Sequence, residues 1–263
     1  KLDKEFEERK DDLVKELSHL MQEILRPEYL CVSYTGERDS LMDVQKQVKA
    51  LKQTLHKEEV SVQHQNMTCV KENEGFTTSG QVQYVAQTGN FRKKGYEYTG
   101  ALNILKVALS YDYLWNNVRV KGGAYGCMNN YTRTGSGYLV SYRDPNLRKT
   151  NEIFEKSVDY TEHFDVSDRD MTKYIIGTIS SMDTPLNARA KGMRSLSAWM
   201  TGVTEEQVQK ERDEVLGCGI EEIRALAPYL KAMLSQNHIC VIGNEEKLEE
   251  QKDLFEVTES LFH

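Results

Sequence analysis

Hydrophobic residues recur at helical spacing through most of the first 56 positions. Apolar side chains spaced close to 3.6 residues apart predict a helix over residues 1–25, which Pro27 ends. Residues 38–56 repeat this pattern, and the strand-forming run Tyr29–Tyr34 lies between the two helices. A helix–strand–helix unit of this size is too small to form a domain alone, so we expect it to pack on another part of the protein.

A polar stretch from residue 57 to residue 80 interrupts the helical pattern. It contains a short predicted strand at Met67–Val70 and a loop-like segment, Glu72–Gly80, that is rich in small and polar residues. We place a domain boundary here. Residues 1–60 are then the end of a preceding domain, and residues 61–263 form a second domain.

The rest of the chain combines a few strands with several helices. Residues 81–87 alternate, with Val82, Tyr84 and Ala86 on one side, as in a half-buried strand. A strong helical pattern over residues 100–116 precedes two strands joined by a hairpin loop. These strands are predicted at 124–131 and 137–143, further helices at 147–162, 168–181, 186–201, 204–227 and 244–255, and a last strand at 238–242. This order predicts an α+β fold, with a mainly antiparallel sheet and helices packed on one face.

Composition narrows the class of protein. The chain of 263 residues is 39% hydrophobic and 29% charged, and no apolar run approaches the ~20 residues that span a bilayer, so we expect no membrane partner. A net charge of −7 argues against a nucleic-acid partner. Five cysteines, none in a CxxC pair, favour a reducing compartment over a disulfide framework. The first twenty residues are too charged to resemble a signal peptide.

Metal-binding motifs are absent from the sequence. It contains neither His-Glu-x-x-His nor the inverted His-x-x-Glu-His. The nearest approach is His56-Lys-Glu-Glu59, where Val60 takes the place of the second histidine. A solvated charge cluster at a helix end explains this segment better, so we expect no metal ligands in this chain.

The most unusual segment joins the predicted helix to the next strand through three glycines. In Leu114-Trp-Asn-Asn-Val-Arg-Val-Lys-Gly-Gly-Ala-Tyr-Gly126, the helix is expected to end near Asn117, and glycine beside a strand marks a bulge or a close backbone approach. Arg119 and Tyr125 flank the turn, where an arginine and a phenol donor suit a carbonyl oxygen or a carboxylate. The alternative is a tight connection in which Arg119 makes a structural ion pair.

These residues also resemble a known family. The segments Val118-Arg-Val-Lys-Gly-Gly-Ala-Tyr-Gly126 and Ser141-Tyr-Arg-Asp-Pro-Asn-Leu147, followed by Thr150, are similar to the last homologous domain of the presequence-protease branch of the pitrilysin/insulinase zinc peptidases. Gln81-Val-Gln-Tyr-Val-Ala86 and Gly100-Ala-Leu102 resemble the start of that domain.

The resemblance implies an enzyme of four related α+β domains whose two halves close around unstructured peptides. Zinc, the cofactor of the whole enzyme, would lie in the first domain on an inverted motif, so this chain alone is predicted to be inactive. Its partners would be peptide substrates and the N-terminal zinc-bearing half of the same polypeptide. Arg119 and Tyr125 would bind a substrate carbonyl and help to stabilise the oxyanion, with Gly122 and Gly123 as further substrate-binding positions.

Two other interpretations remain open at this point. A non-catalytic scaffold or binding subunit would have the same fold, and an unrelated ligand-binding domain would lack a cleft shared by Arg119 and Tyr125. The isolated chain is also expected to expose an apolar face within residues 1–56, through which it could dimerise. We expect a bacterial cytoplasmic location, with an organelle matrix as the alternative.

Overall fold

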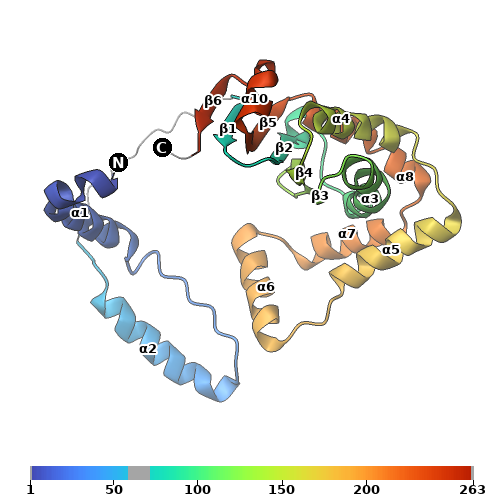
Figure 1. The fold of residues 1–263 in the computed structure, drawn as a ribbon. Coiled ribbons are helices and arrows are strands. Elements are labelled where there is room, and N and C mark those ends of the chain that lie inside the picture. Colours follow the sequence, from blue (N-terminus) through green and yellow to red (C-terminus); the bar gives the residue numbers. More distant parts are fainter. Residues whose placement is uncertain (1, 59–71, 262–263) are drawn as a thin grey trace. The chain divides into compact units, whose positions relative to one another are not determined.

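The computed structural model describes residues 2–58 and 72–261 (Figure 1). The described residues form two compact units, one within Lys1–Thr68 and Pro185–Val203, the other within Cys69–Thr184 and Thr204–His263. The sequence did not indicate that residues 185–203 group with the N-terminal region. The predicted domains, 1–60 and 61–263, stay a prediction, and the strand predicted at Met67–Val70 lies outside the described residues.

The first unit is helical. Its elements are α1 (Leu2–Ile24), the short 3-10 helix η1 (Arg38–Ser40), α2 (Leu41–Thr54) and α6 (Ala188–Thr201). Both helices predicted in the N-terminal region are therefore present. The strand predicted at Tyr29–Tyr34 is wrong, because this segment pairs with no strand in the described part of the chain and an extended backbone needs a hydrogen-bonded neighbour.

The second unit is built on a six-stranded sheet in the order β3-β4-β2-β5-β1-β6. The strands are β1 (Glu74–Thr78), β2 (Gln83–Asn90), β3 (Gly126–Tyr131), β4 (Ser136–Asp144), β5 (His238–Asn244) and β6 (Val257–Ser260). Pairing is antiparallel from β3 through β4 and β2 to β5, whereas β1 runs parallel to both β5 and β6. The mainly antiparallel sheet of the predicted α+β class is thus confirmed.

β1 lies where the sequence predicted a loop, at Glu72–Gly80. Its two neighbours are β5 and β6, which are more than 150 residues away in the sequence. The local signal for a strand is weak because glycine and glutamate begin it. Hydrogen bonds to two distant strands outweigh that local preference, which is the usual reason for such a miss.

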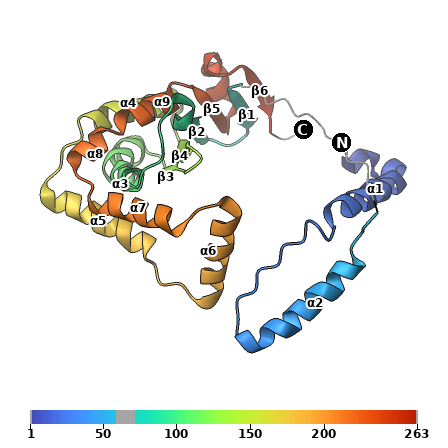
Figure 2. The same cartoon turned by 180° about the vertical axis from the view of Figure 1, so that it is seen from behind.

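The helices of the second unit pack either against one face of this sheet or against the helices that cover that face (Figures 1 and 2). They are α3 (Ala101–Ala108), the π-helix η3 (Leu109–Val120), α4 (Arg148–Glu162), α5 (Asp168–Met182), α7 (Glu205–Leu216), α8 (Ile220–Arg224), α9 (Ala227–Leu234) and α10 (Glu245–Glu250), with 3-10 turns η2 (Phe91–Lys94) and η4 (Lys252–Leu254). The single helix predicted over 204–227 is wrong. Gly217 and Gly219 interrupt it between α7 and α8, because glycine is a poor helix former.

The core lies between the sheet and the helices. Its largest fully buried side chains include Leu105, Leu109 and Leu114 from α3 and η3, and Phe154 from α4. The core therefore holds η3 firmly against the sheet, and the end of η3 carries the candidate site.

Candidate functional site

The helix that leads to the site changes from α-helical to the wider π-helical geometry before it reaches the site. α3 continues directly into η3, a π-helix that ends at Val120 and not near Asn117 as predicted. π-helical segments are rare and occur often at functional sites. The side-chain amides of Asn116 and Asn117 donate to the carbonyl oxygens of Asp112 and Tyr113 at 2.6 and 2.8 Å, and they supplement the backbone bonds of the wide helix.

Arg119 lies in the last turn of η3 and stacks on an aromatic ring. Its guanidinium carbon is 3.8 Å from the ring centroid of Trp115, one turn earlier. Such a cation–π contact holds the side chain while its N–H edges stay free to donate. Arg119 makes no ion pair with a carboxylate among residues 2–58 and 72–261, so the alternative of a structural ion pair is not supported.

Two glycines form the turn that follows, each for a different reason. A Cβ at Gly122 would collide with the carbonyl oxygen of Val118, so only glycine allows this close approach. Gly123 has φ 82°, in the left-handed region that glycine adopts without strain. The predicted close backbone approach at the turn is therefore confirmed.

The segment after β4 is hydrogen-bonded to this turn. Asn146 Nδ2 donates to the carbonyl oxygen of Gly122 at 2.7 Å. The carboxylate of Asp144, which is fully buried, accepts from the backbone N–H of Asn146 at 2.8 Å and from Thr150 Oγ1 at 2.7 Å. The Asp-Pro-Asn segment and the glycine turn are thus one structural unit.

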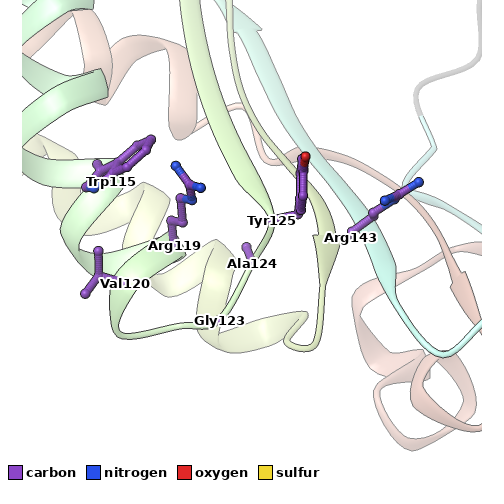
Figure 3. Close-up of a pocket in the computed structure, with 7 residues that line it drawn as sticks. All are labelled: Trp115, Arg119, Val120, Gly123, Ala124, Tyr125 and Arg143. Carbon is purple, nitrogen blue, oxygen red and sulfur yellow. The ribbon is translucent and has the colours of Figure 1, made fainter.

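Tyr125 begins the return into the sheet. Its backbone N–H donates to the carbonyl oxygen of Arg143 at 3.2 Å, and its ring lies 5.6 Å from that of Tyr142. The side chain is 60% exposed, and its hydroxyl points away from the backbone of the turn (Figure 3).

Arg119 and Tyr125 both line one pocket of about 650 Å³. The other lining residues are Trp115, Val120, Gly123, Ala124 and Arg143 (Figure 3). Gly122 shapes the turn but does not line the pocket. The sequence pattern predicted no role for Trp115 or Arg143. The i, i+4 spacing of Trp115 and Arg119 was available as a signal, whereas the position of Arg143 depends on strand pairing.

Burial disfavours the reactive thiolate form of the cysteine beside the site. Burial raises the pKa of the Cys127 thiol to about 11, with Arg119 lowering it and Asp144 raising it by smaller amounts. The thiol is therefore protonated at neutral pH, and the reactive form of cysteine is the thiolate. The side-chain hydrogen-bond donors that line the pocket are the guanidinium groups of Arg119 and Arg143, the hydroxyl of Tyr125 and the indole N–H of Trp115.

The described residues do not fit a zinc ion. No group of three or more His, Cys, Asp or Glu side chains comes together in the described part of the chain, whereas a zinc site needs at least three protein ligands. In a separate respect, none of the helices in the described part of the chain is long and apolar enough to cross a membrane.

Comparison of the sequence with known proteins identifies its relatives. The profile of the PreP C-terminal domain family matches residues 73–245. Protein HypA of Clostridium perfringens is 41% identical over 251 residues, which cover 95% of this chain and 26% of the relative. Presequence protease 1, chloroplastic/mitochondrial, of Arabidopsis thaliana is 30% identical over 266 residues, 99% of this chain and 25% of the relative. The chain spans about a quarter of the length of these relatives.

Solved structures show the same fold. A conserved protein from Enterococcus faecalis V583 superposes with a TM-score of 0.54 at 15% identity, over 80% of this chain and 50% of that one. Pitrilysin superposes with a TM-score of 0.50 at 12% identity, over 76% of this chain and 22% of that one. The profile match over most of the chain shows that the chain belongs to the PreP C-terminal domain family, and its fold is the one seen in pitrilysin.

Proposed function

We propose that this chain is the substrate-binding and closing part of a zinc metalloendopeptidase that degrades unstructured peptides in a closed chamber. Arg119 and Tyr125 bind a carbonyl oxygen of the substrate and stabilise the oxyanion that forms from it. The observation that carries the proposal is that both side chains line one pocket, at opposite ends of a turn that two glycines and Asn146 fix.

The chemistry of the two donors supports this role. A guanidinium offers several N–H donors and no acceptor, and a phenol adds an O–H donor. Donors that are held in place before the reaction stabilise developing negative charge at little cost in reorganisation. Trp115 holds the guanidinium of Arg119 in place, the backbone bond to Arg143 fixes the main chain of Tyr125, and the ring of Tyr125 contacts that of Tyr142.

Zinc would be held by a separate, N-terminal part of the polypeptide, because the described residues do not fit it. The chain alone is therefore expected to be inactive. Relatives carry names that place them in bacteria, mitochondria and chloroplasts. For this chain, the bacterial cytoplasm remains our prediction, with an organelle matrix as the alternative.

The second candidate function is a non-catalytic scaffold of the same fold. A scaffold has no need for two unpaired donors at a shared pocket, nor for the glycine turn that fixes them. The arrangement of Arg119 and Tyr125 favours the peptidase.

The test combines the chain with the zinc-bearing N-terminal part and measures cleavage of an unstructured fluorogenic peptide. Arg119→Ala and Tyr125→Phe are each expected to lower kcat/KM about 100-fold, the typical cost of removing one oxyanion donor. Lys121→Ala is the matched control, since Lys121 lies on the same turn but does not line the pocket. Its kcat/KM should stay within about twofold of the parent.

Two outcomes would contradict the proposal. If both variants cleave at the full rate while they bind the N-terminal part normally, the donors have no role in the reaction. If the parent combination shows no cleavage although zinc is bound, the scaffold interpretation gains the stronger support.

A further inference from the structure

Arg143 is the member of the pocket whose presence the proposed function does not explain. Its guanidinium carbon is 5.5 Å from the ring centroid of Tyr125, on the opposite side of that tyrosine from Arg119 (Figure 3). Its side chain is exposed and, like that of Arg119, makes no ion pair with a carboxylate in the described part of the chain. The pocket thus has two guanidinium groups and no paired counter-charge.

A β-bulge aims Arg143 at the pocket. Gln83 pairs with Asp144 and Val85 with Ser141, so Tyr84 alone opposes both Tyr142 and Arg143. The extra residue shifts the alternation of buried and exposed positions in β4. Residues 137, 139 and 141 are buried, and the next buried residue is 144, not 143. Bulges of this kind occur beside functional sites, where they redirect a side chain.

The backbone of Arg143 is strained. Its φ is 48°, in the left-handed region that long side chains rarely adopt. Glycine would fit this position of the bulge without strain. Strain that persists at a pocket is grounds for a functional hypothesis, because glycine at this position would have avoided the strain.

The carboxylate next to Arg143 in the sequence already has hydrogen-bond donors. Asp144, the residue next to Arg143, is fully buried and accepts from the backbone N–H and the side-chain amide of Asn146 and from Thr150 Oγ1. Its carboxylate is therefore committed to these donors. The N–H groups of Arg143 are left for a ligand.

We propose that Arg143 is an anion subsite of the pocket and binds a carboxylate of the substrate peptide while Arg119 and Tyr125 hold a carbonyl. The inference rests on the proposed function, because it assumes that a peptide enters this pocket. A guanidinium matches the planar carboxylate, and the carboxylate belongs either to the C-terminus of the peptide or to an Asp or Glu side chain.

The chain contains a reporter for this test. It has two tryptophans, Trp115 in the pocket and Trp199 in α6, so Trp199→Phe leaves Trp115 as the single fluorophore. In this background, three N-acetylated peptides of equal length are titrated against the Trp115 emission. One is neutral and C-terminally amidated, one has a free C-terminal carboxylate, and one is amidated but has Glu in place of Gln.

At least one carboxylate peptide is expected to bind about tenfold more tightly than the neutral peptide, in line with one charge-assisted hydrogen-bonded pair. The tighter of the two identifies the source of the carboxylate. The preference should disappear in Arg143→Gln and persist in Arg143→Lys. Arg143→Gly should lose the preference and unfold at a higher temperature than the parent, because glycine relieves the strained φ.

Equal binding of all three peptides, or a preference that survives in Arg143→Gln, would overturn the anion subsite. The proposed function would then still stand on the cleavage assay with Arg119→Ala. If none of the peptides binds, the anion subsite also fails, whereas the proposed function is decided separately by the cleavage assay with the N-terminal part.

Discussion

Two glutamines face the core of the second unit from the same side of β2. Gln83 and Gln87 are both fully buried. Gln83 Oε1 accepts from the backbone N–H of Asn244 at 2.8 Å, whereas neither amide atom of Gln87 has a hydrogen-bond partner among the described residues. A buried amide without partners costs free energy that an apolar side chain of similar shape would not.

Gln87→Met is therefore expected to raise the free energy of unfolding by about 1 kcal/mol. Gln83→Met is the matched comparison, and it should lower the free energy of unfolding by about 1–2 kcal/mol because it leaves the N–H of Asn244 without its acceptor. Urea unfolding followed by circular dichroism measures both. A loss of stability in Gln87→Met would show that its amide has a partner, such as a buried water.

These glutamines also explain why the sequence predicted β2 but not its orientation. The alternation of residues 81–87 predicts a half-buried strand with Val82, Tyr84 and Ala86 on one side. In the structure Gln83, Val85 and Gln87 are buried, and Tyr84 is 45% exposed. A period of two identifies a strand, but only the packed helices decide which face is covered.

At the scale of elements, the site depends on the contact between two segments that are distant in sequence. Asn146 joins the segment after β4 to the turn after η3 through its bond to the carbonyl oxygen of Gly122. Nothing in the local pattern of either segment predicts this bond. The sequence could predict Arg119 and Tyr125 from the glycines between them, but not Trp115 and Arg143, whose roles depend on the π-helix and on the bulge.

Asn146→Ala is expected to act on the position of Arg119 and Tyr125. Loss of the bond to Gly122 should lower the free energy of unfolding by about 1 kcal/mol and lower kcat/KM in the reconstituted protease about tenfold. Thr150→Val is the control, because it removes a donor to the same Asp144 carboxylate without touching the turn. It should lose comparable stability and keep its cleavage rate. If both variants lose the same activity, Asn146 has only a structural role.

The strands that the sequence missed share one physical cause. β1 and β6 are short, and their order depends on parallel partners from remote parts of the chain. Helices were easier to predict because their hydrogen bonds are local. The N-cap bonds of Ser167 and Thr204, for example, lie within three residues of the helix start.

At the scale of the whole molecule, the two units differ in how well they bury apolar side chains. The large buried core belongs to the second unit. In the first unit, α2 and α6 contain no buried residue, and α1 exposes much of its apolar face. Its exposed side chains include Phe6, Val14, Leu17, Leu20, Met21 and Ile24. The predicted exposed apolar face within residues 1–56 is therefore confirmed, whereas dimerisation through it remains a prediction.

We expect the isolated chain to self-associate through α1, because contiguous exposed apolar surface tends to be covered by another chain. Sedimentation velocity at increasing protein concentration should show a shift from monomer towards twice that mass. Leu17→Glu should abolish the shift, since it places a charge on the apolar face, where Leu17 is 59% exposed. Gln22→Glu adds the same charge on another side of α1 and should leave the shift in place. A monomer at all concentrations, or equal effects of the two substitutions, would show that this face does not associate.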